Sequence, residues 1–357
     1  MDETIHLDGA LGEGGGQVLR TSLSLAALLR RPLQLTRIRA GRARPGLAAQ
    51  HLTGVLAVAA VSRGQVEGAA LGSQELFFNP QPPRGGEYEF DVADVRPSAG
   101  ATGLVAQVLL PLLWFCREPS RVLLRGGTHV PWSPSFHYLA EVFLPTLARM
   151  GAVAQASLKQ AGWYPQGGGE MVLEVTPLSG PLQPLRLTEA GPVRITGLSA
   201  ASNLPRHILR RQAESAQKRC RQAGYQASLE QVLLPGRGAG TVCFLRTETG
   251  AVAGGFTALG APGKPAEQVG REAAEALLTH LQRGGAVEEH LADQLILYLA
   301  LAAGRSTFTT SCLSRHLLTN VQVVERFLPV RFAITGSEGE PGEVSVEGIG
   351  YVPETDS

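Results

Sequence analysis

The chain contains very little lysine, and this scarcity limits the covalent chemistry open to it. Only Lys159, Lys218 and Lys264 occur in 357 residues, and arginine supplies the rest of the 32 basic side chains. The lysines lie in the segments K-Q-A-G, K-R-C-R and K-P-A-E, none of which looks like a nucleotidyl acceptor. If the protein forms a covalent nucleotide intermediate, histidine is therefore the available nucleophile, because neutral imidazole is present near pH 7.

Cysteine is also rare, and long apolar runs are missing. The four cysteines are scattered without C-x-x-C spacing, which argues against a zinc site or a disulfide scaffold. No stretch is apolar over the roughly 20 residues that a membrane helix needs. The opening M-D-E-T-I-H-L-D lacks the basic and apolar regions of a secretion signal. These features predict a cytoplasmic protein with no membrane partner.

The common nucleotide-binding motifs are absent as well. Neither G-x-x-x-x-G-K-[ST] nor a complete G-x-G-x-x-G is present, so a P-loop or a dinucleotide fold is not supported. Two glycine triplets do occur, in E-G-G-G-Q-V-L-R from Glu13 to Arg20 and in Q-G-G-G-E from Gln166. The first precedes a predicted helix, where bare backbone N–H groups would attract an anion. A tight turn explains either triplet equally well.

Acidic residues are missing from one long segment near the start of the chain. Between Gly14 and Val66 there is no Asp or Glu, although the net charge of the whole chain is only +1. The segment holds eight arginines: Arg20, Arg30, Arg31, Arg37, Arg39, Arg42, Arg44 and Arg63. Such a local excess of positive charge could bind phosphates, or could simply be solvated surface. We favour phosphates, because R-I-R-A-G-R-A-R-P-G gathers four of the arginines in one predicted loop.

A supersecondary pattern recurs three times along the chain. Each copy has a helix, a strand, a polar loop with Gly, Pro or Ser, a second helix and further strands. The second helices are predicted at Leu47–Ser62, Phe136–Met150 and Leu317–Phe327. We therefore predict an α/β (α+β) fold, whose core contains three repeated units, each with two helices packed on a four-stranded sheet.

A different pattern interrupts the repeats. From residue 185 to residue 283 the chain alternates strand, basic helix Arg206–Ala223, strands and helix Glu267–Gln282. We predict a smaller inserted α/β domain over residues 185–283, and a repeat-built catalytic core from residues 1–184 and 284–357. Loops that follow the middle strands of the repeats should converge, and convergent loops on a rigid scaffold are where sites form.

Four residues in these repeats are candidates for chemistry. His316 follows the predicted strand Ser306–Thr310 and begins an amphipathic run, so it is either an ordinary surface or core histidine or a reactive one. Asp293 and Gln294 lie on the first turns of an otherwise apolar helix, which fits helix-start chemistry or a buried site. Gln107 interrupts the apolar helix of the second unit, where a lone Gln is more often a satisfied core amide than a site residue.

Together these segments resemble the RNA 3′-terminal phosphate cyclases, in particular the catalytic members of that family. The resemblance runs through L-D-G-A-L-G-E-G-G-G-Q-V-L-R-T-S-L-S-L, R-I-R-A-G-R-A-R-P-G-L-A-A-Q-H and R-G-G-T-H-V-P-W-S-P. It continues in H-L-A-D-Q-L-I and in H-L-L-T-N-V-Q-V-V-E-R-F-L-P-V-R-F near the end. It therefore spans essentially the whole chain, the inserted domain included.

The resemblance implies a specific reaction. Family members adenylylate a histidine with ATP, transfer AMP to an RNA 3′-phosphate, and let the neighbouring 2′-OH displace AMP to form a 2′,3′-cyclic phosphate. The attack by that hydroxyl benefits from the high effective concentration of an intramolecular reaction. The expected partners are thus ATP as substrate and RNA with a 3′-terminal phosphate.

The resemblance also implies roles for particular residues. His316 matches the family's nucleophilic histidine, and Glu13 matches a glutamate linked to Mg²⁺ or Mn²⁺. The ATP site carries over as Gln107, Pro134, Tyr138, His290, Asp293 and Gln294. His290 and Pro134 are expected to sandwich the adenine, although some relatives have tyrosine at the position of His290. The residues expected near phosphates of nucleotide or RNA are Arg20, Arg42, Arg44, Gln50 and His51.

Two other functions stay open. One is a non-catalytic cyclase-like protein in ribosome or RNA assembly, although such relatives lack the histidine that stands here in R-H-L-L-T-N. The other is a metabolic transferase on a similar scaffold, such as an enolpyruvyl transferase, which would need a pocket for a small anion and no such insert. The possibility of a homodimer also stays open.

Overall fold

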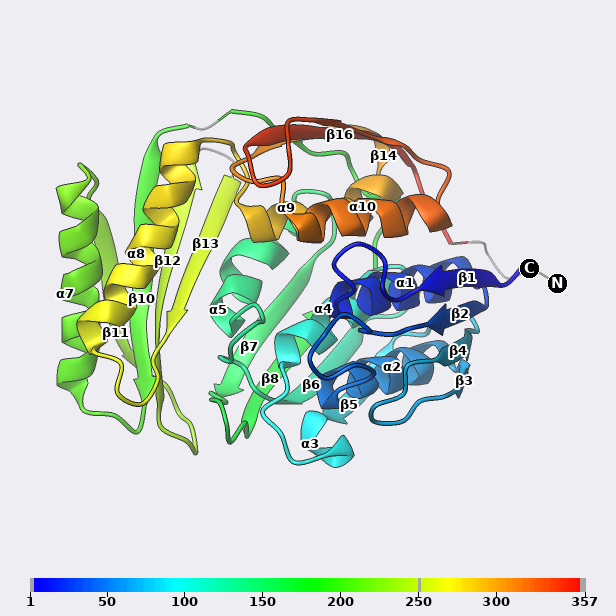
Figure 1. Cartoon of the computed structure of the whole chain (residues 1–357), viewed down its shortest axis with the longest axis horizontal. Helices are drawn as coiled ribbons and strands as arrows, with labels where there is room; N and C mark the ends of the chain where they lie inside the picture. The colour runs from blue at the N-terminus through cyan, green and yellow to red at the C-terminus, as the bar shows by residue number, and fades with distance from the viewer. Residues whose placement is uncertain (1–2, 190, 250–251, 354–357) are drawn as a thin grey trace.

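The computed structural model describes residues 3–189, 191–249 and 252–353, and its core repeats one β-α-β-α-β-β unit (Figure 1). Each unit's sheet has a parallel pair of strands followed by two antiparallel partners. In the first unit the order across the sheet is β1-β2-β4-β3. Its elements are β1 (Ile5–Asp8), α1 (Gly16–Leu29), β2 (Leu33–Thr36), α2 (Ala49–Ser62), β3 (Gln65–Glu67) and β4 (Leu76–Asn79).

The second unit repeats this order as β5-β6-β8-β7, with extra helical turns. Its elements are β5 (Gly86–Asp91), α3 (Val92–Val95), α4 (Thr102–Trp114), β6 (Ser120–Gly126), α5 (Phe136–Tyr138), the π-helical turn η1 (Leu139–Phe143), α6 (Leu144–Ala148), β7 (Ala154–Gln160) and β8 (Gly169–Val175). The helix predicted over Phe136–Met150 is present as one continuous helical run over residues 136–148, with a π-helical turn in its middle. Pro145 favours that turn, because it lacks the N–H that an α-helix needs there.

The third unit has the order β9-β14-β16-β15 and is interrupted after its first strand. Its elements are β9 (Arg186–Leu187), α9 (Glu289–Leu301), β14 (Ala303–Thr310), α10 (Arg315–Phe327), β15 (Phe332–Thr335) and β16 (Gly342–Ile349). The fold class predicted from the sequence is thus confirmed, with three like units and a strand ahead of each first helix that the pattern had not indicated.

The interrupting segment forms a sheet of its own, ordered β11-β10-β12-β13. Its elements are β10 (Val193–Ser202), α7 (Arg206–Gln222), β11 (Ala227–Leu233), β12 (Gly240–Thr249), β13 (Val252–Leu259) and α8 (Ala266–Arg283). β9 lies within the segment predicted as the insert, residues 185–283, yet it pairs with β14 of the core. The separate sheet begins only at β10.

The helices of the three units pack together in the middle of the molecule. α1 contacts α2, α4 and α10, and α9 contacts α10. The helices that pack together therefore come from all three units. α4 is apolar on nearly every side, which suits a helix surrounded by others. Figure 1 shows α9 and α10 lying beneath β14 and β16, beside α1. This packing brings distant parts of the sequence to one place.

The insert sheet uses both of its faces. Figure 1 shows α7 and α8 covering one side, where Cys243, Leu245 and Leu277 form a separate small core. On the other side, Leu198 and Phe244 join the main core together with residues of α5 and η1. A hydrogen bond between His280 Nδ1 and Ser311 Oγ, 2.9 Å long, ties the end of α8 to the loop before α10. No helix in the described part of the chain is long and apolar enough to cross a membrane.

Candidate active site

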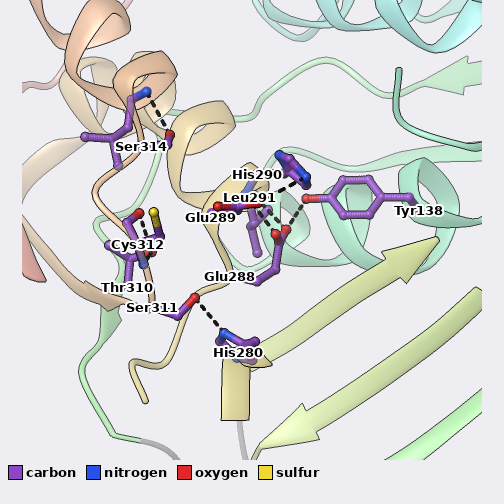
Figure 2. Close-up of polar contacts among 11 residues, drawn as sticks. Tyr138, His280, Glu288, Glu289, His290, Leu291, Thr310, Ser311, Cys312 and Ser314 are labelled. Atoms are coloured by element: carbon purple, nitrogen blue, oxygen red, sulfur yellow. Dashed lines mark hydrogen bonds and ion pairs between the residues drawn. The ribbon is translucent and has the colours of Figure 1, made fainter. Parts of the chain in front are cut away.

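His316 lies at the start of α10, where the preceding loop is fixed by a helix cap. The Ser314 hydroxyl accepts a hydrogen bond from Leu317 N at 3.2 Å, as Figure 2 shows. The His316 side chain is 47% exposed, and its Nε2 lies 2.7 Å from Glu13 Oε2. Glu13 is placed in turn by its backbone N–H, which donates to Thr319 Oγ1 at 3.1 Å. One turn of α10 therefore positions both members of the pair.

The histidine is held in its neutral form. Partial burial lowers the pKa of His316 below its ordinary value of 6.5, and the charges of Arg20 and Arg42 act in the same direction. The Glu13 carboxylate opposes them and raises the pKa, but burial is the larger effect. A neutral imidazole has a lone pair on one nitrogen, and it can attack an electrophile at neutral pH.

The glycine triplet is explained by close approach of two side chains. Gly15 caps α1 and Gly16 begins it. A Cβ on Gly15 would lie 2.7 Å from Arg42 Nη2, and one on Gly16 would lie 2.5 Å from His51 Nε2. Any larger residue would displace these groups, so the sequence E-G-G-G-Q keeps a bare backbone at the place where Arg42 and His51 meet the helix start.

Arginines surround the Glu13–His316 pair. Arg42 forms an ion pair with Glu13 through Oε1, the carboxylate oxygen that does not face His316. Arg20 donates to Gln17 Oε1 at 2.7 Å, and burial lowers the pKa of its guanidinium to about 10, against the attraction of Asp293. Arg39, which the sequence did not single out, donates to the Gly46 carbonyl at 2.7 Å and acts electrostatically on His51. Its membership of the same arginine cluster was the available signal.

His51 and Gln50 have different surroundings although they are neighbours on α2. His51 is buried, and burial together with Arg20 and Arg39 lowers its pKa to about 3, so it stays neutral. Its Nδ1 accepts from Ala48 N at 3.2 Å, which leaves Nε2 facing the start of α1. Gln50 Oε1 instead accepts from Ala101 N at 3.0 Å, so its amide fastens α2 to the start of α4. Arg44 is exposed and forms no ion pair within the described residues.

Behind this cluster lies a small cavity of about 40 Å³ between α1, α4, α9 and α10, with apolar as well as polar side chains in its wall. Three of its side chains are Arg20, Gln107 and Gln294. Gln107 Nε2, Gln294 Oε1 and the neighbouring Asp293 Oδ1 are buried without a hydrogen-bond partner among the described residues. Unpaired buried polar atoms are costly, so a site of this size suits water or part of a polar ligand.

Asp293 carries a buried carboxyl group at the edge of this cavity. Burial raises its pKa to about 7, although Arg20 attracts the charged form. Asn320 stabilises the same region, because its Nδ2 donates to the Asp293 carbonyl at 2.9 Å and its Oδ1 accepts from Thr21 Oγ1 at 2.7 Å. The carboxyl can thus hold or release a proton near neutral pH.

Tyr138 is committed to a structural contact. Its hydroxyl donates to Glu288 Oε1 at 2.5 Å, and Glu288 caps α9 by accepting from His290 N at 2.8 Å and Leu291 N at 2.7 Å (Figure 2). Burial and the Glu288 charge raise the pKa of Tyr138 well above 10. His290 itself is largely exposed, and its Nε2 lies 3.6 Å from Glu289 Oε1. Pro134 lies farther along, against Gly103 at the start of α4.

The surroundings of His316 offer a divalent metal ion one carboxylate, that of Glu13. No group of three or more His, Cys, Asp or Glu side chains in the described ranges is arranged to hold a metal ion. Glu13 is the nearest acidic side chain to His316, and it is engaged by Arg42 and His316. That arrangement fits a Mg²⁺ ion bound through a single carboxylate and the phosphates of a substrate, which is the common mode for Mg²⁺.

Comparisons with known proteins agree on one family. The sequence model of the family described as RNA 3′-terminal phosphate cyclase matches residues 11–334. An RNA 3′-terminal phosphate cyclase of Pyrobaculum neutrophilum is 44% identical over 97% of this chain and 99% of its own length. The protein of that name from Methylococcus capsulatus is 46% identical over 96% of both chains, and that from Staphylothermus marinus is 42% identical over 98% and 100%.

Solved structures contribute less. The enolpyruvyl transferase NikO from Streptomyces tendae is similar over 98% of this chain and 82% of that chain, with 11% identity and a TM-score of 0.25. A similarity this weak carries no argument about either fold or activity.

Proposed function

The chain belongs to the RNA 3′-terminal phosphate cyclase family, and on that basis we propose that it converts an RNA 3′-terminal phosphate into a 2′,3′-cyclic phosphate at the expense of ATP. The proposed nucleophile is His316. The observation that carries this assignment is a neutral, half-exposed imidazole at a helix start, flanked by Glu13, Arg20 and Arg42.

In the first step a ring nitrogen of His316 attacks the α-phosphorus of ATP. The bond from that phosphorus to the bridging oxygen breaks, pyrophosphate leaves, and the imidazole loses its N–H proton as the phosphoramidate forms. Arg20 and Arg42 lie where they can bind phosphate oxygens, and planar guanidinium groups suit them. The cavity lined by Gln107 and Gln294 would take polar parts of the nucleotide.

Glu13 lies beside one ring nitrogen of His316, with its Oε2 atom 2.7 Å from Nε2. When Nε2 carries the proton, the lone pair is on Nδ1. Attack through Nε2 requires Glu13 to leave that nitrogen. Glu13 is also the residue that would hold Mg²⁺ or Mn²⁺, which supplies charge neutralisation at the phosphates when bound.

In the second step an oxygen of the RNA 3′-phosphate attacks the phosphorus of the adenylylated histidine. The P–N bond breaks, and His316 regains a proton. The vicinal 2′-OH then attacks the RNA phosphorus, loses its proton and displaces AMP. The arginine-rich loop that ends at Arg44 is the proposed contact for the RNA backbone, and the remaining residues of the proposed ATP site are Pro134, Tyr138, His290 and Asp293.

The non-catalytic alternative predicts a different surface. A scaffold protein needs no neutral histidine beside arginines and no unpaired polar atoms in a buried cavity. Both are present here, so the enzymatic function is the one the geometry favours.

Product analysis tests the proposal. An oligoribonucleotide with a labelled 3′-phosphate is incubated with the protein, ATP and Mg²⁺, and then treated with phosphatase. A cyclic product keeps its label, whereas an unchanged terminal phosphate is removed. Label that stays fully sensitive to phosphatase, with wild-type protein and saturating ATP, would show that the protein does not cyclise RNA ends.

A further inference from the structure

Trp132 is displayed on the surface in a conformation that costs free energy. Its side chain is 98% exposed, and its φ angle of +64° is in the left-handed region that bulky residues rarely adopt. The other two tryptophans, Trp114 and Trp163, are buried. Neither packing nor backbone preference explains a tryptophan at position 132, in the sequence V-P-W-S-P.

A second exposed aromatic residue lies on the neighbouring loop. Tyr164 is 70% exposed and belongs to the loop that joins β7 to β8. This loop is bonded to that of Trp132, because Thr128 N and His129 N each donate to Gly162 O at 3.0 Å. The ring of His129 stacks on Trp163 with centroids 4.8 Å apart. The two exposed aromatics thus project from a common, well-packed base.

The loops that carry and support the two aromatics contain no acidic residue. Residues 126–140, 161–169 and 231–247 contain no Asp or Glu. The third segment reaches the aromatic loops through Ala161 N, which donates to Pro235 O at 2.7 Å. It contributes Arg237, which is exposed and forms no ion pair within the described ranges. An anionic chain would therefore meet no carboxylate within these loops.

The same loop is continuous with the candidate active site. It runs from β6 to α5, where Tyr138 donates to Glu288, and Glu288 caps the helix that carries Asp293. An RNA strand whose 3′ end reaches His316 could thus extend along α9, α5 and the loop before α5, which are joined by hydrogen bonds. Isolated aromatics on loops without carboxylates suit a nucleobase better than a protein, because protein docking needs a continuous apolar patch.

We propose that Trp132, with Tyr164 on the neighbouring loop, stacks on an unpaired base of the RNA substrate upstream of its phosphorylated 3′ end. The inference rests on the proposed function and adds a binding subsite to it. Stacking on an aromatic ring tolerates any base, since every base has a π-face. The subsite would therefore hold the strand with little regard to sequence.

Trp132→Gly is the informative substitution, because glycine accepts the left-handed conformation and removes the ring. The variant should unfold at the same temperature as the wild type or higher. With a 3′-phosphorylated single-stranded oligoribonucleotide, its KM for RNA should rise by about 5- to 150-fold, the range of one lost stacking contact. Trp132→Phe should restore much of the loss. Val153→Ala is the control, since Val153 is exposed just before the opposite end of β7.

An abasic series identifies the contact itself. Oligonucleotides lacking one base at a time should show one position where loss of the base weakens wild-type binding but not the binding of Trp132→Gly. Such non-additivity is the signature of a direct pair. If every abasic position has the same effect in both proteins, the stacking proposal is wrong. A fall in the melting temperature of Trp132→Gly with unchanged RNA binding would make Trp132 structural and overturn it too.

Self-labelling with ATP separates this inference from the function on which it rests. Trp132→Gly should form the protein–AMP adduct at the wild-type rate, because the subsite contacts RNA alone. If the wild type itself forms no adduct, the proposed function fails. If the adduct forms normally and RNA use is unchanged in the variant, only the aromatic subsite fails.

Discussion

At the residue scale, the chemistry depends on the pair of His316 and Glu13. Their 2.7 Å contact fixes the imidazole, and partial burial keeps it neutral. The Glu13 carboxylate also forms an ion pair with Arg42, so one of its oxygens contacts a cation and the other contacts the proposed nucleophile. A substitution at Glu13 should therefore change the pKa of His316.

Glu13→Gln should shift the pH dependence of self-labelling to lower pH. The carboxylate is the group that raises the pKa of His316, while burial and the arginines lower it. In the wild type, labelling is lost as pH falls through the lowered pKa, below 6.5. Without the carboxylate, this loss of labelling should occur at a still lower pH, even if the maximal rate also falls. Labelling rates from about pH 4 to about pH 8 locate this loss, and a shift upward would contradict the account.

Asp293→Asn should change how stability depends on pH. The carboxyl has a pKa of about 7 in the folded protein, above its ordinary value of 3.8, because it is buried. Between these values the folded state holds a proton that the unfolded chain releases, so this group makes the protein less stable as pH rises. The asparagine cannot ionise. The free energy of unfolding of the variant, measured by thermal unfolding, should therefore increase relative to that of the wild type from about pH 4 to about pH 7. The increase should be about 1.4 kcal/mol per pKa unit at most.

Asp94→Asn, which alters an exposed carboxyl in α3, is the control for this comparison. If Asp293→Asn instead loses stability relative to the wild type as pH rises, the ionised carboxylate is the stabilising form and the burial argument fails.

At the element scale, three helices are joined by one amide. Asn320, one turn after His316 on α10, links Thr21 of α1 to the Asp293 carbonyl of α9. Each helix carries a residue of the proposed site, namely Arg20, Asp293 and His316. Their mutual positions therefore depend on Asn320, which also lines the small cavity proposed to take polar parts of the nucleotide.

Asn320→Ala should lower kcat for self-labelling. It removes the acceptor of the Thr21 hydroxyl and the side-chain donor to the Asp293 carbonyl, which costs about 0.5–1.5 kcal/mol in stability for each lost hydrogen bond and loosens α10. Gln212→Ala is a matched control, because this buried amide of the insert accepts from Ser199 Oγ at 2.7 Å and Thr241 Oγ1 at 2.9 Å. Equal losses of labelling in both variants would mean that general destabilisation, and no particular link, is responsible.

The sequence was sufficient for most elements and insufficient for their contacts. Period and turn residues predicted the helices α2, α7, α8 and α10 within a few residues, because α7, α8 and α10 each present one apolar face and α2 is apolar over most of its length. The first strand of each unit was missed; β1 and β9 are very short, whereas length does not explain the omission of β5. Contacts such as Glu13 with Thr319 join segments far apart in sequence, and a single sequence contains no signal for them.

At the scale of the whole molecule, charge is distributed unevenly. The net charge is +1, yet the eight arginines from Gly14 to Val66 have no acidic neighbour in sequence. The structure divides them: Arg42 pairs with Glu13, whereas Arg44 is exposed and forms no ion pair with any described residue. The two arginines should therefore act in different steps.

Arg44→Ala should weaken RNA binding and leave self-labelling unchanged. Each lost phosphate contact should reduce the slope of log K against log salt by about 0.7 for a single strand. Arg42→Ala should also slow labelling, because Arg42 contacts Glu13 and acts on His316. Arg63→Ala, an exposed arginine at the far end of α2, is the control. If Arg44→Ala binds RNA with unchanged affinity and salt slope, this loop is solvated surface.

The existence of the insert could be predicted from the sequence, but its packing against the core could not. A separate α/β segment was predicted from its change of pattern, and a separate sheet is present. Its packing was not predictable, because Phe244 and Leu198 are ordinary apolar residues in a strand, and nothing in their spacing says that they cover α5 and η1. The platform of Trp132 and Tyr164, on loops that this packing supports, was missed for the same reason.

The most direct test of the central claim is to locate AMP on the protein. Wild-type protein is incubated with Mg²⁺ and ATP labelled at the α-phosphate, digested, and analysed by mass spectrometry alongside His316→Ala and His316→Asn. The account predicts a single AMP on the peptide that contains His316, joined by an acid-labile P–N bond, and no label in either variant. Label on another residue, or label that persists in His316→Ala, would contradict it.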